Sequence, residues 1–388
     1  MSNSDADLTP PPWLDTVRRV EFPVTARWAY LDHATVSPMP ARTAAVLAER
    51  IATLQDPSRE SGQREAYAAE ARERLGRLMN VAPGQVALLT NLAEAMAIVA
   101  NGLPWASGDE VVTPEQEFSS LVYPWLNLER FGVRVVFVPK QGPATELAAI
   151  ANAITPRTRV VAVSHVEFQN GFRHDMEALG RLCADRGVLL AVDVTQSLGV
   201  LPVDARAWRA DVVAAHGYKW LMAMHGIAAL YVSEAAMARI RPTVPGRSSV
   251  TGGFESLDFA LDWHPDARRY QSGGPNWLGA AAVATSLGLT EEIGIAAGAA
   301  QATAVADAVL AGLDALPVTI TTDLRPNHRS QIVSFSTGSE ETDRRLVTKA
   351  KEAGVYLGRR GMGVRVAAHF WNAADDAKRL LEVVRHEA

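Results

Sequence analysis

The sequence predicts an α/β protein, in which a large domain on a mainly parallel sheet precedes a small α+β domain. Residues 188–192 and 212–215 form continuous apolar runs rich in β-branched residues, which is typical of buried parallel strands. Further apolar runs alternate with helical patterns, as in α/β folds. Shorter strand and helix patterns after residue 331 indicate the small domain.

Composition limits the kinds of protein that this chain can be. Its 388 residues, 48% hydrophobic and 21% charged, are typical of an ordinary globular protein with room for two domains. The net charge of −5 and the absence of a Lys/Arg cluster predict no nucleic-acid partner. No apolar run approaches the length of a membrane span, and the polar, proline-rich start lacks a signal-peptide layout, so we expect a cytoplasmic location.

The chain contains one cysteine, Cys183, on a predicted helix. A single cysteine excludes an intramolecular disulfide and any cysteine-based metal cluster. We therefore expect no metal site, and we expect Cys183 to be a small core residue.

The first half of the chain is expected to alternate helices and strands. A short helix is predicted at 13–20, and two helices within 42–78 are separated by a break at 56–58. Strands are expected at 86–90, 109–113, 133–138 and 160–163, with helices at 91–103 and 175–186.

The second half is expected to complete the sheet and to form the small domain. A strand at 227–232 precedes a long loop at 241–268, a helix from 277 to 294 and another to about 316. Residues 331–336 alternate as in a half-exposed strand, followed by helix 342–353, strands 355–358 and 364–367, and a helix from 374. These patterns divide the chain into a large domain, 26–285, and a small domain, 286–388. The N-terminal segment 1–25 is assigned to the small domain.

An aspartate and a lysine are expected to meet at one edge of the sheet. Asp193 follows the run 188–192, and Lys219 follows the run 212–215. Carboxyl ends of parallel strands are where α/β sheets place their ligand chemistry. For an arbitrary aspartate and lysine, an ion pair at the ends of two strands would be enough to explain why the two residues lie together.

The surrounding residues favour a more specific interpretation. The pattern D-x-x-Q-x-x-G at Asp193, followed by an apolar strand and H-G-Y-K-W-L, resembles the class V aminotransferase family. The resemblance implies fold type I, with a seven-stranded large-domain sheet, and pyridoxal 5'-phosphate (PLP) as cofactor. It implies that Lys219 forms the Schiff base and that Asp193 faces the pyridine nitrogen. Gln196 would donate to the ring oxygen, and His216 and Tyr218 would bind the phosphate.

The same resemblance extends to other cofactor contacts. Asn91, Leu92 and Ala93 begin a helix where relatives hold the phosphate with backbone amides, and helix starts attract anions. Phe118 would stack on the pyridine ring. Gly274, in R-Y-Q-S-G-G-P-N, would contact the phosphate of a neighbouring subunit, so a homodimer with shared active sites is expected. Ala93 and Gly274 replace threonines that are usual in the family.

Substrate contacts are also implied by the resemblance. Arg365, within V-R-V-A-A-H-F-W-N, would hold the substrate carboxylate, and Arg360 precedes it in R-x-G. His33, in Y-L-D-H-A, is a candidate for substrate contact, with a structural hydrogen bond as the alternative. Phe168 and Tyr123 would make the substrate pocket more apolar.

The reaction type stays open at the level of sequence. We expect transamination or β-elimination of C–S lyase type on an α-amino acid, through a Lys219 aldimine and a quinonoid. An epimerase is the alternative, and a non-catalytic binding protein of the same fold is a further one. Cysteine desulfurase is disfavoured, because residues 325–365 contain no cysteine for persulfide transfer.

Overall fold

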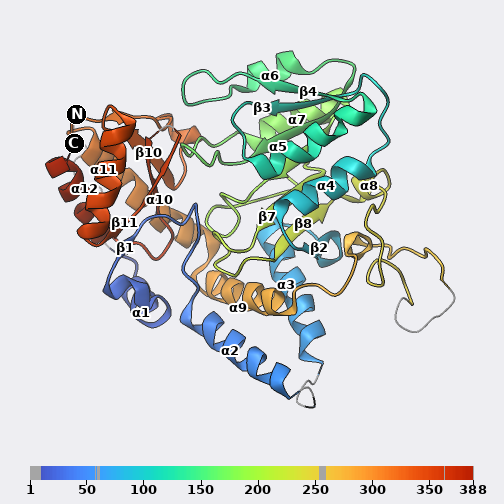
Figure 1. Ribbon diagram of the computed structural model, residues 1–388, viewed down its shortest axis with the longest axis horizontal. Coiled ribbons are helices and arrows are strands. Elements are labelled where there is room, and N and C mark those ends of the chain that lie inside the picture. The colour runs from blue at the N-terminus through green and yellow to red at the C-terminus, as the bar shows by residue number, and fades with distance from the viewer. Residues whose placement is uncertain (1–9, 57, 59–61, 253–258, 362, 388) are drawn as a thin grey trace.

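The computed structural model describes residues 10–56, 58, 62–252, 259–361 and 363–387. Figure 1 shows a large sheet flanked by helices on one side of the molecule and a smaller group of helices and strands, which includes α10, α11, α12 and β10, on the other. The division of the chain into 26–285 and 286–388 stays a prediction. Helix α9 (Trp277–Ile293) runs through residue 285, and the chain turns between α9 and α10 (Ile295–Leu313) at Gly294, which has φ 83°.

The large sheet has seven strands in the order β2-β8-β7-β6-β5-β3-β4. The five strands from β7 to β4 are parallel, whereas β8 is antiparallel to both β7 and β2. This arrangement confirms the expected mainly parallel, seven-stranded sheet. Its strands are β2 (Val86–Leu89), β3 (Glu110–Pro114), β4 (Arg134–Val138), β5 (Thr158–Ser164), β6 (Leu189–Asp193), β7 (Val212–His216) and β8 (Ala228–Val232).

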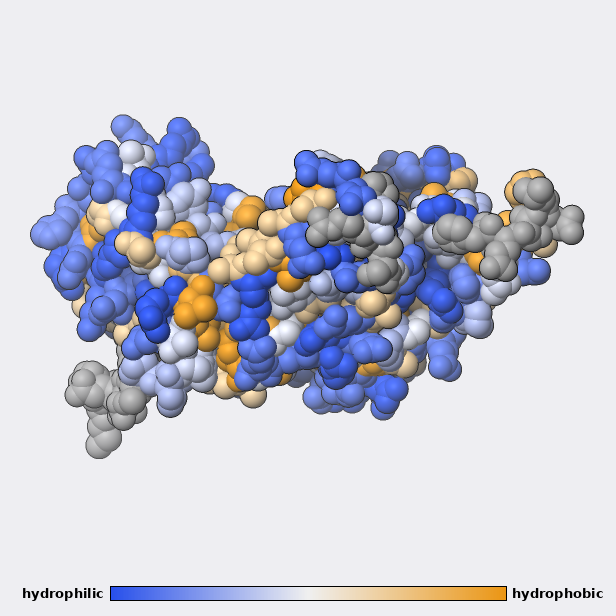
Figure 2. Space-filling model, turned by 90° about the horizontal axis from the view of Figure 1, so that it is seen from below, coloured by the Kyte–Doolittle hydropathy of each residue, from blue (hydrophilic) through white to orange (hydrophobic). Residues whose placement is uncertain are grey.

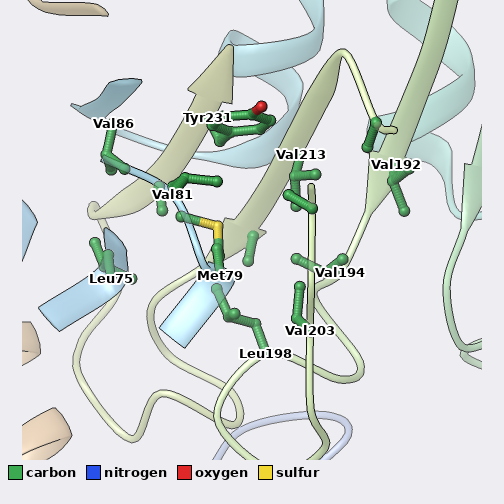
Figure 3. Packing of buried hydrophobic residues seen from close by; sticks show 14 of the residues in the cluster. Leu75, Met79, Val81, Val86, Val192, Val194, Leu198, Val203, Val213 and Tyr231 are labelled. Carbon is green, nitrogen blue, oxygen red and sulfur yellow. The ribbon is translucent and has the colours of Figure 1, made fainter. Parts of the chain in front are cut away.

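The continuous apolar runs are explained by burial on both faces of the sheet. Successive side chains of β6 alternate between two cores, as a strand requires. Leu190 and Val192 join the core that includes α3 (Gln63–Met79), and Leu189 and Ala191 join the core on the opposite face. Figure 3 shows the first of these cores, in which side chains from the end of α3 lie beside those of the central strands.

Helices cover both faces of this sheet (Figure 1). The predicted break at 56–58 is confirmed, because α2 ends at Gln55 and α3 begins at Gln63. The short helices α5, α6 and α8 were not predicted. The helices of this part are α2 (Ala41–Gln55), α3, α4 (Leu92–Gly102), α5 (Ser119–Leu126), α6 (Leu147–Ala153), α7 (Met176–Arg186), α8 (Glu234–Met237) and α9.

The C-terminal part has an antiparallel sheet in the order β12-β13-β10-β9, and β1 (Ala29–Tyr30) pairs with β11 beside it. The predicted strand at 355–358 is split between β11 and β12. The elements are α10, β9 (Thr319–Ile320), β10 (Ile332–Ser336), α11 (Glu340–Glu352), β11 (Val355–Tyr356), β12 (Gly358–Arg360), β13 (Gly363–Ala367) and α12 (Ala374–Glu387). The first helix, α1 (Leu14–Glu21), is tied to α12, because Arg18 pairs with Asp376 at 2.8 Å.

The expectation of a half-exposed strand at 331–336 was wrong, and the expectation that no apolar stretch has the length of a membrane span meets one exception, α10. Strand β10 is almost entirely buried rather than half-exposed, because both of its faces are covered. Val333 and Phe335 pack in the core that includes α10, and Ile332, on the opposite face, packs with Val166 and Trp220. Helix α10 is the one helix within the described ranges that is long and apolar enough to cross a membrane by length and composition. It supplies Val305, Val309 and Leu313 to the core of the small domain, which accounts for its apolar character.

Helix α7 packs very closely on the segment before β7. A Cβ atom on Gly180 would lie 1.7 Å from the carbonyl oxygen of Trp208. Glycine in a helix ordinarily costs about 1 kcal/mol relative to alanine, so most such substitutions stabilise a helix. At Gly180 the clash with the Trp208 carbonyl makes the same substitution destabilising.

We expect Gly180→Ala to lower the free energy of unfolding by about 1–3 kcal/mol, because the helix must move away from the sheet. Denaturant unfolding followed by circular dichroism measures the change. Gly288→Ala is the matched control, since its Cβ would meet only the flexible Arg74 side chain at 3.4 Å. Equal or greater stability of Gly180→Ala than of the unsubstituted protein would contradict the expectation.

Candidate active site

Lys219 lies just beyond the carboxyl end of β7, at the edge of the sheet where the sequence placed it. Its side chain is buried, and its Nζ is 5.2 Å from the centre of the Phe118 ring and 5.9 Å from that of Tyr218. An ammonium group in such a pocket loses most of its hydration. Lys219 is therefore a buried amine enclosed by aromatic rings.

The pKa of Lys219 is lowered to about 8. Burial is the largest cause, and the positive charges of Arg365 and Arg360 add to it, while Asp193 acts in the opposite direction. A neutral amine is the nucleophilic form, so the environment makes this lysine reactive near neutral pH.

Asp193 ends β6 and is 4% exposed, with Oδ1 accepting the amide N–H of Thr195 at 2.7 Å. Burial raises its pKa, and the hydrogen bonds from Thr195 and the charge of Lys219 oppose that rise. Ser164, at the end of β5, is its cross-strand neighbour. A buried carboxyl group at this point suits a partner that carries a proton on nitrogen, such as a pyridinium.

Two phenylalanines form one wall of the pocket. The rings of Phe118 and Phe168 meet edge to face, 5.2 Å apart, and Phe118 also faces Lys219. This geometry is consistent with the expected stacking of Phe118 on a flat ring.

The side-chain amide of Gln196 has two hydrogen bonds. Its Nε2 donates to the Ala34 carbonyl at 3.1 Å, and its Oε1 accepts from the Trp220 indole at 2.8 Å. Its second N–H is the one that could serve a ring oxygen, so that role stays a prediction.

The candidate phosphate end lies at the start of α4. The Asn91 side chain caps this helix by accepting the N–H of Glu94 at 2.9 Å. Leu92 and Ala93 are the first two helical residues, whose amides have no acceptor within an α-helix. Such amides and the positive helix end attract phosphate.

His216 and Tyr218 are neighbours in space, with ring centres 4.9 Å apart. Burial lowers the pKa of His216 to about 4, and Lys219 and the exposed His225 add to this effect. His216 is therefore neutral near pH 7 and can act as a hydrogen-bond donor. Burial raises the pKa of Tyr218, so its hydroxyl keeps its proton. His225, which sequence reasoning missed, stacks on Tyr218 with ring centres 3.8 Å apart.

Gly274 lies beside the start of α4 of its own chain. It lines a cavity of about 310 Å³ together with Thr90 and Glu94. A Cβ at this position would be 3.4 Å from the Trp277 ring, which is an ordinary van der Waals contact. The expected contact with a neighbouring subunit stays a prediction.

Arg365 is the candidate carboxylate-binding group. It lies on β13, is 1% exposed, and donates to the Phe168 carbonyl at 2.7 Å, to Asp32 at 3.1 Å and to the Thr35 hydroxyl at 2.7 Å. Its Nε has no hydrogen-bond partner among the described residues. Burial lowers the pKa of Arg365 to about 10, partly opposed by Asp32. The guanidinium is thus charged and held in place, and its Nε–H donor has no acceptor among the described residues.

Thr35 joins Arg365 to Arg360. Its hydroxyl accepts from Arg360 at 2.6 Å and from Arg365 at 2.7 Å, and it donates to Asp32 at 2.8 Å. Asp32 and Thr35 were not singled out from the sequence. Their spacing of three residues in an irregular segment gave no signal, because their partners lie more than 300 residues away.

His33 is fully buried, and the structure favours the structural alternative for it. Its Nδ1 is 2.8 Å from the Ser37 hydroxyl, and its ring packs edge-on against Trp371 at 4.7 Å. Burial holds the pKa of His33 well below its usual range.

Tyr123 is on α5 with 68% of its surface exposed. The expected contact of Tyr123 with the substrate stays a prediction.

Glu117 and Trp220 are two further residues that the sequence did not reveal. Glu117 precedes Phe118, is buried, and accepts both the amide and the hydroxyl of Ser164 at 2.6 Å. Burial and Glu167 raise its pKa well above the usual range. Trp220 is joined to Gln196 through its indole and to His369 of the small domain through its carbonyl, at 3.1 Å.

The residues of this pocket fit PLP. A buried amine with a lowered pKa, a buried carboxyl group, a facing aromatic ring and a helix start for a phosphate occur together. Within the described ranges, no group of three or more His, Cys, Asp or Glu residues is arranged to hold a metal ion.

We expect the neutral fraction of Lys219 to be half-maximal at about pH 8. Carbamylation of the cofactor-free protein by cyanate across pH, followed by mass spectrometry, measures this, with the exposed Lys378 as a rate reference. Asp193→Asn should move the midpoint to lower pH, because it removes a charge that favours the ammonium form. A midpoint above pH 10 in the unsubstituted protein would contradict the expectation.

Comparisons with known proteins agree with this geometry. The chain is 31% identical to a probable cysteine desulfurase of Methanothermobacter thermautotrophicus, over 72% of this chain and 71% of that protein. It is 28% identical to an uncharacterized aminotransferase, YcbU, of Bacillus subtilis, over 58% of this chain and 59% of that one.

Solved structures share the fold. An apo cysteine desulfurase from Thermococcus onnurineus matches with TM-score 0.86 and 23% identity, covering 96% of this chain and 97% of that chain. The cystine C-S lyase C-DES, in complex with cysteine persulfide, matches with TM-score 0.88 and 23% identity, covering 95% of this chain and all of the other. The family model described as aminotransferase class-V matches residues 29–380. The chain therefore belongs to the class V aminotransferase family of PLP-dependent enzymes.

Proposed function

We propose that the protein acts on an α-amino acid through Lys219, by transamination or by β-elimination of C–S lyase type. The observation that carries this proposal is the buried amine of Lys219, with its pKa lowered to about 8, facing Phe118 and electrostatically coupled to Asp193 and Arg365. When bound, PLP supplies a ring that accepts electrons from the substrate α-carbon. The protein then has to orient the substrate and move a proton.

Each residue has a distinct task in this proposal. Lys219 removes the α-proton and returns one, as a base of this pKa can do near neutral pH. Asp193 keeps the pyridine nitrogen protonated, and Phe118 covers the ring. Arg365 binds the substrate carboxylate, for which its unpartnered Nε is available. Phe168 adds an apolar edge beside Phe118, which favours an apolar or sulfur-bearing side chain.

Cysteine desulfurase activity is less favoured, although relatives carry that name. Persulfide transfer needs an accessible thiolate near the substrate. The one cysteine, Cys183, is on α7, is 1% exposed and belongs to the large core. Burial raises its pKa to about 12, so it remains a thiol.

Epimerisation remains the alternative reaction, because it uses the same lysine. It differs from transamination only in where the proton returns, and from elimination in that the β-substituent is kept. A non-catalytic binding protein of this fold is the second alternative. The smaller residues Ala93 and Gly274 at the phosphate end favour it, since two expected hydroxyl groups are absent.

The absorption spectrum tests the enzyme proposal. We expect PLP to give a yellow band in the wild type that shifts as individual amino acids are added, and Lys219→Ala to lack the wild-type band. A pyridoxamine-like spectrum with a keto acid would identify transamination, and pyruvate or a related product would identify elimination. Exchange of the α-proton with neither product would identify an epimerase. No band after incubation with PLP would contradict the enzyme proposal and favour the binding protein.

We propose further that the active unit is a homodimer in which α2 is part of the interface. This helix buries Thr43, Arg50 and Thr53, and it exposes several apolar residues together with the polar Glu49 and Gln55. Its exposed residues include Ala44, Ala45, Ala48, Ile51, Ala52 and Leu54. Figure 2 shows an apolar stripe on this face of the molecule. A second copy is the occupant that the family resemblance favours, because the active sites would then lie near the shared face.

Ile51→Glu places a charge in the centre of this stripe, where Ile51 is 53% exposed. We expect the wild type to sediment as a dimer and Ile51→Glu to sediment as a monomer, because an unpaired charge is costly to bury. Ala311→Glu, at an exposed position on α10, is the control and should leave the dimer intact. A monomeric wild type would contradict the proposal. An Ile51→Glu variant that dimerises with the same dissociation constant as the wild type would also contradict it.

A further inference from the structure

A second cavity lies between α2, α3 and the start of α9, and Lys219 is not among the described residues that line it. It has a volume of about 340 Å³. Arg50, Thr53 and Leu54 of α2 line it, together with Arg64 and Tyr67 of α3 and the segment 275–278. Two arginines line this space, and the described residues around it include no aspartate or glutamate.

Arg50 is the unusual member of this cavity. Its side chain is only 10% exposed, and its Nη2 donates to Glu49 at 2.6 Å. Its Nε and Nη1 are buried and have no hydrogen-bond partner among the residues that the structure describes. Buried N–H groups of a charged side chain are normally satisfied, because unpaired ones destabilise the fold. An arginine kept in this state calls for an acceptor from outside the chain.

The ends of two helices add positive potential to the same space. Helix α3 begins after Gly62 without a side-chain cap, and Arg64 and Tyr67 in its first turns line the cavity. Helix α9 begins after Asn276, which also lines it. The amino ends of helices carry partial positive charge that favours anions. Tyr67, Leu54 and Trp277 give the cavity an apolar wall.

We propose that this cavity binds a small-molecule oxyanion, a carboxylate or phosphate group, on the unpartnered N–H groups of Arg50. The anion supplies the acceptors that Arg50 lacks, and the rest of the ligand lies against Tyr67 and Trp277. The site adjoins the cavity at Gly274, with which it shares Pro275 and Asn276, and it does not depend on the reaction proposed for Lys219.

Anion titration of the PLP-saturated protein tests this proposal. Saturation with PLP fills the phosphate position at α4, so added anions report on other sites. The probes are sodium phosphate and sodium benzoate, each at constant ionic strength, followed by thermal unfolding and calorimetry. Stabilisation by phosphate alone would assign a phosphate ligand, and stabilisation by benzoate alone would assign an organic carboxylate. Stabilisation by both would assign the shared oxyanion chemistry.

Arg50→Met is the decisive variant, because methionine fills the space of the side chain without a charge. We expect it to weaken anion binding by about tenfold or more. In anion-free buffer it should unfold at the same temperature as the wild type or higher, since an unpaired buried charge has been removed. Arg77→Met is the control, because Arg77 is on α3, 58% exposed and outside the cavity.

Three outcomes would overturn the proposal. The first is equal stabilisation of the wild type and Arg50→Met by both anions. The second is a lower unfolding temperature of Arg50→Met in anion-free buffer, which would show that Arg50 serves the fold alone. The third is a loss of dimer formation in Arg50→Met without any anion effect, which would assign the missing acceptor to a second copy of the chain.

Discussion

The interaction on which the active-site architecture depends is the burial of a lysine amine beside a carboxyl group at the carboxyl edge of the sheet. Water would stabilise both charges, so neither residue could be buried alone without a large loss of hydration. Lys219 and Asp193 offset part of that loss for each other, and two-sided burial of β6 and β7 fixes where their side chains emerge. The fold thus holds a reactive amine in a buried position.

Two arginines and a threonine extend this electrostatic arrangement to the small domain. Arg365 and Arg360 lower the pKa of Lys219 and are themselves connected by the Thr35 hydroxyl. Trp220, the residue after the lysine, is bonded to His369 of the small domain and to Gln196 of the large one. The state of the amine therefore depends on how the two parts of the chain meet, as well as on its own strand.

The sequence was sufficient where a side chain's position follows from its own strand or helix. Asp193 and Lys219 follow apolar runs, and Asn91 begins a helix, so local pattern placed all three. Thr35, Glu117 and Trp220 could not be found in this way, because their partners are on distant elements.

The solvent exposure of individual side chains was the other property that local sequence patterns did not predict. The alternation in β10 indicated one exposed face, but that face packs on Val166 and Trp220, while α10 covers the other. Tyr123 was expected among the substrate contacts. The intervening chain turns into α5, a helix that was not predicted, and this carries the residue to the surface.

The contact between Arg365 and Asp32 joins residues 333 positions apart. During synthesis on a ribosome, the segment with Asp32 and Thr35 emerges early, and the strand with Arg365 emerges close to the end. Contacts of such separation form late, because a long loop has to close first. The large sheet can assemble while the chain grows, but the carboxylate-binding half of the pocket cannot. Cofactor capture in its final geometry is thus a step that follows translation, and a chain that stops before β13 would carry Lys219 without a complete site.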